Sequence, residues 1–117
     1  MRHLKKGSYF GIHKETVDMN GLVITDTEYT HDHVPWHYHE NAYLTFMLKG
    51  CITETNKKET ITCPPGTLLF HHWQEPHCNT KLPGYAQGFH LEFEKNWFDQ
   101  RMVDSARFEG SFQIKNP

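Results

Sequence analysis

Two histidine-rich segments carry the residue types best suited to chemistry in this chain of 117 residues. His37 and His39 precede an apolar stretch that ends at Gly50, and His77 lies in the second segment. On a β-strand, residues i and i+2 point to the same side, so His37 and His39 are expected to face one common space. Three imidazoles from neighbouring strands can bind zinc, iron, copper, nickel or manganese and leave a position open for water or substrate.

Two further interpretations of these histidines remain open. The imidazoles can hydrogen-bond a small molecule without any metal, or they can serve only packing and surface roles. Tyr43 shares the strand parity of His37 and His39, and Trp36 is expected at the rim of the same pocket. Aromatic rings with a few polar groups are typical of sugar-binding pockets, although core packing also explains such rings.

The other buried-strand histidines are harder to assign. His71 and His72 differ in parity, so at most one of them faces the pocket, and a structural or surface role is favoured for His71. His90 lies opposite the apolar positions of its strand, and the sequence does not decide whether it points inward or outward.

Composition and missing motifs exclude several classes of function. The net charge is −2 with no basic segment or helix-turn-helix, so nothing in this chain is suited to reading DNA. No nucleophile elbow, P-loop or dinucleotide fingerprint is present. The apolar run 44–48 is too short to cross a membrane, and no secretory signal opens the chain. Three cysteines without a Cys-x-x-Cys pair indicate reduced thiols and predict a cytoplasmic protein without membrane association.

Short strands separated by glycine and proline turns dominate the rest of the chain and predict an all-β barrel or sandwich. Residues 1–20 are expected to form an arm or edge segment and 21–95 the barrel. Residues 96–117 are expected to hold a short helix over 97–103 and an irregular tail. Within the barrel, strands are predicted at 22–29, 42–48, 67–70, 77–80 and 85–93, a hairpin at 51–63, and a polar connection at 31–36.

These motifs resemble those of the cupin superfamily. His37, His39 and Gly50 match the spacing of the first cupin motif, but Tyr43 stands where that motif has glutamate. His77 matches the histidine of the second motif, whose proline, glycine and asparagine are replaced here by His72, Gln74 and Lys81. The resemblance implies a double-stranded β-helix, or jelly-roll barrel, that lacks the usual carboxylate ligand. Tyr43 could replace that ligand only as a phenolate, which requires a strongly lowered pKa.

Residues 20–117 also resemble the N-terminal sensor domains of AraC-type transcription regulators, in the segments 36–41, 65–71, 74–77 and 88–97. That resemblance implies an effector-binding regulatory domain that acts as a homodimer. It would meet DNA only through a C-terminal helix-turn-helix domain absent from this chain.

The first expectation is therefore a domain that binds a small, sugar-like effector at Trp36, His37, His39, Tyr43 and His77. The alternative is a metal-dependent cupin enzyme, a dioxygenase or isomerase, with zinc, nickel, iron or manganese at His37, His39 and His77. In a third interpretation the His-x-His pair serves only packing and dimer contacts.

Overall fold

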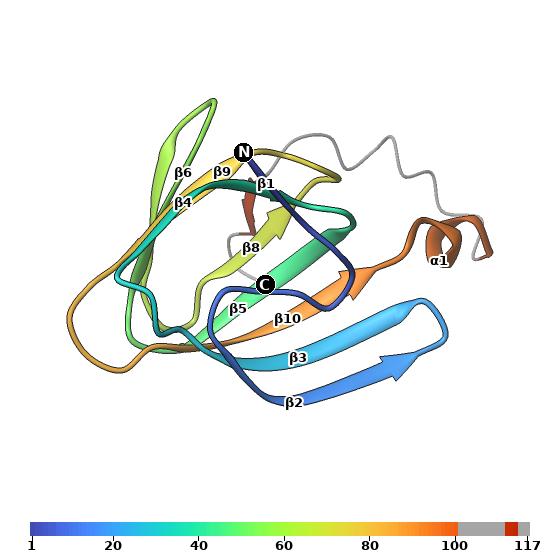
Figure 1. Cartoon of the computed structure of the whole chain (residues 1–117), viewed down its shortest axis with the longest axis horizontal. Helices are drawn as coiled ribbons and strands as arrows, with labels where there is room; N and C mark the ends of the chain where they lie inside the picture. The colour runs from blue at the N-terminus through green and yellow to red at the C-terminus, as the bar shows by residue number, and fades with distance from the viewer. Residues whose placement is uncertain (101–111, 115–117) are drawn as a thin grey trace.

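Two β-sheets pack into a barrel in the computed structural model, which describes residues 1–100 and 112–114 (Figure 1). A five-stranded sheet has the order β1-β4-β9-β6-β7, and a six-stranded sheet has the order β11-β8-β5-β10-β3-β2. The strands are β1 (Arg2–Leu4), β2 (Ile12–Met19), β3 (Leu22–Glu28), β4 (His33–His39), β5 (Ala42–Lys49), β6 (Ile52–Asn56), β7 (Thr60–Cys63), β8 (Leu68–His71), β9 (His77–Lys81), β10 (Gln87–Phe93) and β11 (Phe112–Ile114). The single helix of these residues, α1, spans Lys95–Gln100. This helix is too short to cross a membrane. The predicted all-β barrel with a short helix after its last long strand is confirmed.

The apolar run before Gly50 forms β5, a central strand that pairs antiparallel with β8 and β10. Gly50 ends this strand with φ of 74°, and a Cβ at this position would lie 2.2 Å from the carbonyl oxygen of Tyr85. Only glycine fits such a close approach in the left-handed region. The glycine of the first histidine motif therefore has a structural role in turning the chain from β5 towards β6.

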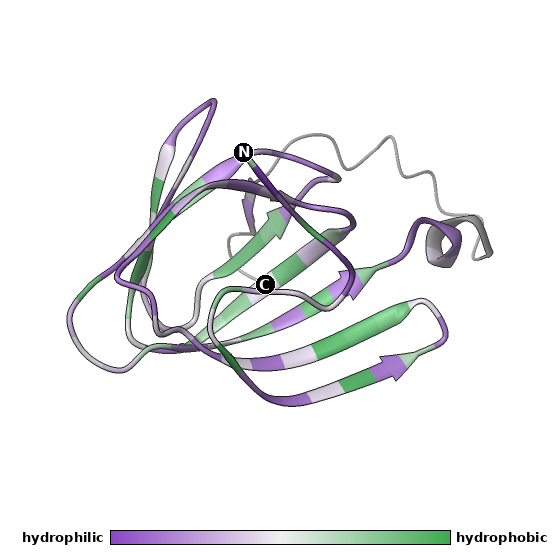
Figure 2. Cartoon of the chain, viewed as in Figure 1, coloured by the Kyte–Doolittle hydropathy of each residue, from purple (hydrophilic) through white to green (hydrophobic). Residues whose placement is uncertain are grey.

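The interior of the barrel contains more polar side chains than the apolar residues of its strands would predict. On β10, His90 and Glu92 are buried, whereas Phe89 and Leu91 are only half-buried on the outer side. A compact apolar cluster lies elsewhere in the barrel and consists of Met47, Ile52, Ile61, Cys63 and Leu69. Figure 2 shows hydrophobic residues along β5 and β8 and hydrophilic ones at the turn between β6 and β7. The apolar cluster therefore leaves room in the barrel for a group of buried polar side chains.

The predicted strands and the hairpin β6–β7 are present, with ends that differ from the prediction by one or two residues, and three other predictions need correction. The expected polar connection at 31–36 is wrong, because β4 begins at His33. Its pairing with β9 is irregular between Val34 and His37, where Pro35, which has no N–H to donate, is accommodated. Helix α1 begins two residues before the predicted 97, and residues 101–103 of that prediction lie outside the described residues. The tail, predicted to be irregular, contains β11, which pairs with β8.

Candidate metal and ligand site

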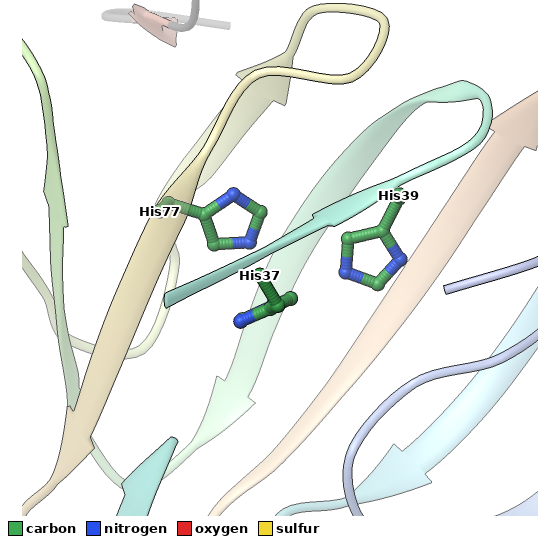
Figure 3. A group of neighbouring side chains, drawn as sticks. All are labelled: His37, His39 and His77. Carbon is green, nitrogen blue, oxygen red and sulfur yellow. The ribbon is translucent and has the colours of Figure 1, made fainter. Parts of the chain in front are cut away.

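His37, His39 and His77 converge inside the barrel (Figure 3). His37 and His39 lie on the same side of β4, and His77 on β9 is in register with His37. The ring of His77 lies 4.3 Å from that of His37 and 5.5 Å from that of His39, measured between centroids. One nitrogen from each ring lies within 4.8 Å of the others, and all three side chains are buried. The structure thus brings together the three histidines that the spacing singled out.

Backbone carbonyls orient two of these rings. His37 Nδ1–H donates to the carbonyl oxygen of Pro35 at 2.8 Å, and His77 Nδ1–H donates to that of Glu75 at 3.0 Å. Because the N–H is fixed on Nδ1, the lone pair lies on Nε2 in both rings. Metal-binding histidines are commonly held in this way. Within the described residues, the buried Nδ1 of His39 has no hydrogen-bond partner.

Burial keeps these imidazoles in the neutral form that a metal requires. It lowers the pKa of His37, lowers that of His39 well below its usual value, and lowers that of His77 to about 4. In each case the main cause is loss of hydration, which penalises the charged ring. At neutral pH the cluster therefore presents uncharged nitrogen donors.

Tyr43 lies in the same pocket, as predicted, but it does so from β5, because the strand of His37 and His39 ends at His39 and does not continue to position 43. Its hydroxyl donates to Nε2 of His77 at 3.1 Å, and its ring stacks on His71 with centroids 4.0 Å apart. Burial raises the pKa of Tyr43 well above its usual value, so the side chain is a neutral phenol in this pocket. Tyr43 therefore acts as a hydrogen-bond donor here, and the phenolate that metal ligation would need is disfavoured.

Trp36 is not brought to the pocket. It precedes His37 on β4, so its side chain points to the opposite side of the sheet, and 41% of it is exposed. The residues that line the pocket do not include it. The prediction that Trp36 lies at the rim of the pocket is therefore wrong, because neighbouring residues of a strand face opposite sides of the sheet.

Two interior residues were missed or assigned differently by sequence reasoning. The surface role considered for His71 is wrong, whereas a structural role is not contradicted: its Nε2 lies 2.7 Å from Glu54 Oε1 inside the barrel, and both side chains are buried. Glu54 also lies 4.0 Å from His77 Nε2. A carboxylate thus reaches the histidines from β6, although Tyr43 occupies the glutamate position of the first motif.

Charge and hydrogen bonding compete at Glu54. Burial by itself raises the pKa of this carboxyl, but attraction to His71 and His77 and hydrogen bonds from His71 and Asn79 lower it to about 2. Glu54 is therefore an anion at neutral pH. Its second oxygen, Oε2, is buried and has no hydrogen-bond partner among the described residues.

The N-terminal segment adds two aromatic rings to the pocket. Tyr9 lies against His39 with a centroid distance of 4.8 Å, and Phe10 lies 5.0 Å from His37. The Tyr9 hydroxyl donates to Glu92 at 2.9 Å. The segment before β2 has no hydrophobic period, so no pattern in the sequence could have placed these rings.

His90 is also buried inside the barrel, but its surroundings differ. Its Nε2 lies 2.7 Å from the hydroxyl of Tyr29, and its Nδ1 lies 3.4 Å from the hydroxyls of Thr25 and Thr27. Its ring stacks on that of Tyr9 at 3.7 Å between centroids. His90 is thus a core histidine with partners at both nitrogens.

Comparisons with models of known protein families and with curated protein sequences give no match. Solved structures do match. A cupin-2 domain protein from Shewanella frigidimarina aligns with a TM-score of 0.59 and 15% identity over 73% of this chain and 85% of its own. KdgF from a Halomonas species aligns with a TM-score of 0.61 and 14% identity over 69% of this chain and 76% of its own. The DMSP lyase DddQ from Ruegeria pomeroyi aligns with a TM-score of 0.60 and 18% identity over 66% of this chain and 40% of its own.

These likenesses concern the fold, and nothing in them associates the chain with AraC-type regulators, so that association stays a prediction. The matched structures include a lyase and proteins of unknown function. Together with the two-sheet barrel, they show that the chain has the cupin fold.

Proposed function

We propose that this chain is a metal-dependent cupin that binds one divalent ion at His37, His39 and His77 and holds a small molecule beside it. The observation that supports this most directly is the convergence of three buried, neutral imidazoles whose nitrogens lie within 4.8 Å of one another. Imidazole donors suit Zn²⁺, Ni²⁺, Cu²⁺ and Fe²⁺.

The residues around the cluster define what the chain itself contributes. When bound, the metal would supply Lewis acidity, either to activate water or to polarise a substrate carbonyl. Tyr43 can donate a hydrogen bond, and Glu54 places a negative charge next to the cluster. Tyr9, Phe10 and Tyr29 give the pocket aromatic walls that exclude water from part of it. A small polar molecule with an apolar side fits such walls, and the lyase among the matched folds is compatible with catalysis here.

Metal analysis tests the proposal directly. Protein purified without an affinity tag should carry or take up about one equivalent of Zn²⁺ or Ni²⁺, and the double substitution His37→Ala/His77→Ala should abolish it. His33→Ala is the matched control, because His33 lies on β4 with His37, is exposed and is not one of the three converging histidines. Binding that survives in the double variant, or that is lost equally in the control, would contradict the proposal.

A second candidate is the effector-binding regulatory domain. It is favoured by the N-terminal segment, because Tyr9 and Phe10 bring residues from outside the barrel strands into the pocket wall. A bound effector would contact this segment and could shift its equilibrium between two arrangements. In a thermal-shift screen of sugars and small acids, a compound that binds should then raise the melting temperature of the metal-free protein. Stabilisation that strictly requires metal would instead favour the metal-dependent cupin.

A further inference from the structure

A second set of possible metal ligands lies next to the three histidines and shares His77 with them. Glu54, His71 and His77 offer one ligand atom each within 4.8 Å of one another, and all three side chains are buried. The set contains two imidazoles and one carboxylate and draws on β6, β8 and β9, so neither His37 nor His39 is part of it.

The distances inside this set are close to those of a coordination sphere. Neighbouring ligands at about 2.1 Å from a metal lie roughly 3.0 to 3.4 Å apart in octahedral or tetrahedral geometry. Here Glu54 Oε1 lies 2.7 Å from His71 Nε2 and 4.0 Å from His77 Nε2. Small side-chain rotations would bring both distances into that range. The ion would replace the proton between His71 Nε2 and Glu54, and that proton would move to Nδ1 or to solvent.

A buried carboxylate oxygen of Glu54 without a hydrogen-bond partner in the described part of the chain also indicates that a metal ion can bind here. Glu54 Oε2 is buried and has no hydrogen-bond partner among the described residues. A buried carboxyl oxygen without a partner is unfavourable unless a cation or a donor compensates it. His71 and Asn79 compensate only Oε1. A metal ion held by Glu54 would supply the missing partner.

The two ligand sets cannot be filled together. Nδ1 of His77 donates to the carbonyl oxygen of Glu75, so only Nε2 of this ring is available to a metal. Carboxylates suit harder cations such as Mn²⁺, and two histidines with one carboxylate are a typical Fe²⁺ set, whereas three imidazoles suit Zn²⁺ and Ni²⁺.

We propose that Glu54, His71 and His77 form a second metal-binding site, whose carboxylate lets it hold harder divalent cations such as Mn²⁺ or Fe²⁺, and that this site competes with the three-histidine site for His77. The proposal shares His77 with the proposed function, but its two other ligands are separate, so the two can fail independently.

Reciprocal substitutions test it, with Mn²⁺ followed by electron paramagnetic resonance and Zn²⁺ by competition with a chromophoric chelator. Glu54→Gln keeps the shape of the side chain and should weaken Mn²⁺ binding at least about tenfold and Zn²⁺ binding much less, because the carboxylate would be a ligand of Mn²⁺ but only a neighbouring charge for Zn²⁺. His39→Leu should do the opposite. In the unaltered protein, Zn²⁺ should displace Mn²⁺ one for one. Glu59→Gln, at an exposed carboxylate of the same hairpin, is the control and should change neither affinity.

Each variant keeps one metal, and that retained metal shows that the barrel is folded. Equal weakening of both metals by Glu54→Gln and His39→Leu would indicate a single joint site and overturn the proposal. Simultaneous binding of Mn²⁺ and Zn²⁺, or no Mn²⁺ binding in the unaltered protein, would overturn it as well. Glu54-dependent Mn²⁺ binding without any Zn²⁺ binding would support the second site and contradict the three-histidine site.

Discussion

Two groups of histidines inside the barrel are equally buried but are held in different ways. His90 has a partner at each ring nitrogen and a stacked ring on its face. In the group of His37, His39 and His77, backbone carbonyls accept a hydrogen bond from Nδ1 of His37 and from Nδ1 of His77, and Nδ1 of His39 has no partner among the described residues. Burial lowers the pKa of all four, so neither burial nor the direction of the pKa shift separates a structural histidine from a ligand. The distinction lies in the nitrogens of His37 and His39 that are unpartnered within the described chain, whereas Nε2 of His77 accepts a single hydrogen bond, from the Tyr43 hydroxyl, that a metal would have to displace.

A fall in pH should have the largest effect on the free energy of unfolding, because burial lowers the pKa of the histidines in both groups. The pKa of His77 is about 4 in the folded chain and near 6.5 when unfolded, so below pH 6.5 the unfolded chain binds a proton that the folded chain does not. Stability is therefore complete above pH 6.5 and is lost as the pH falls towards 4, by about 3 kcal/mol from His77 alone. His37, His39 and His90 act in the same direction. Glu54, with its pKa lowered to about 2, adds a further loss below pH 4.5.

Urea unfolding of metal-free protein between pH 8 and pH 4 measures this loss. The exposed His33→Ala variant should follow the same curve as the unaltered protein. A free energy of unfolding that stays constant between pH 7 and pH 5 would mean that the imidazoles are not buried as described.

Substitution by leucine should separate the two groups by the size of its effect on the free energy of unfolding. His90→Leu leaves the Tyr29 hydroxyl without its partner and removes a stacked ring, so the free energy of unfolding should fall by about 2–3 kcal/mol. His39→Leu keeps most of the volume and removes an unpartnered buried nitrogen, so it should cost less than about 1 kcal/mol or stabilise the metal-free protein.

The comparison is made by chemical denaturation at pH 8 in a chelating buffer, where no metal contributes. If His39→Leu destabilises the chain as strongly as His90→Leu, His39 is a structural residue, and the proposed division of the interior is wrong.

The sequence predicts part of this arrangement for clear physical reasons. His37 and His39 are two residues apart, and the period of a strand puts them on one side regardless of register. Trp36 precedes them, and the same rule places it on the other side, so its assignment to the rim conflicted with the period itself. His77 required a long-range pairing, which the cupin resemblance supplied.

Glu54 and His71 could not be predicted by the same rule. On β6 both faces carry polar residues, and on β8 both faces are apolar, so alternation gives no inward side. The cupin motif places a carboxylate at position 43, which is on β5 here, whereas the carboxylate that lies near the histidines is on β6, a strand of the other sheet. Tyr9 depends on the course of an aperiodic segment across the barrel, which only tertiary structure determines.

The smallest expected effect concerns Tyr43, whose hydroxyl occupies the lone pair that both proposed metal sites need. In Tyr43→Phe the ring still stacks on His71, but Nε2 of His77 loses its donor. Metal-free protein should lose about 1 kcal/mol, and Zn²⁺ should bind about fivefold more tightly, because the ion no longer displaces a hydrogen bond. Calorimetric titration and thermal melts measure the two changes, with Tyr38→Phe, on the opposite side of β4, as the control. Weaker Zn²⁺ binding in Tyr43→Phe would show instead that the phenol takes part in coordination, and the distinction between satisfied and free imidazoles would have to include its oxygen.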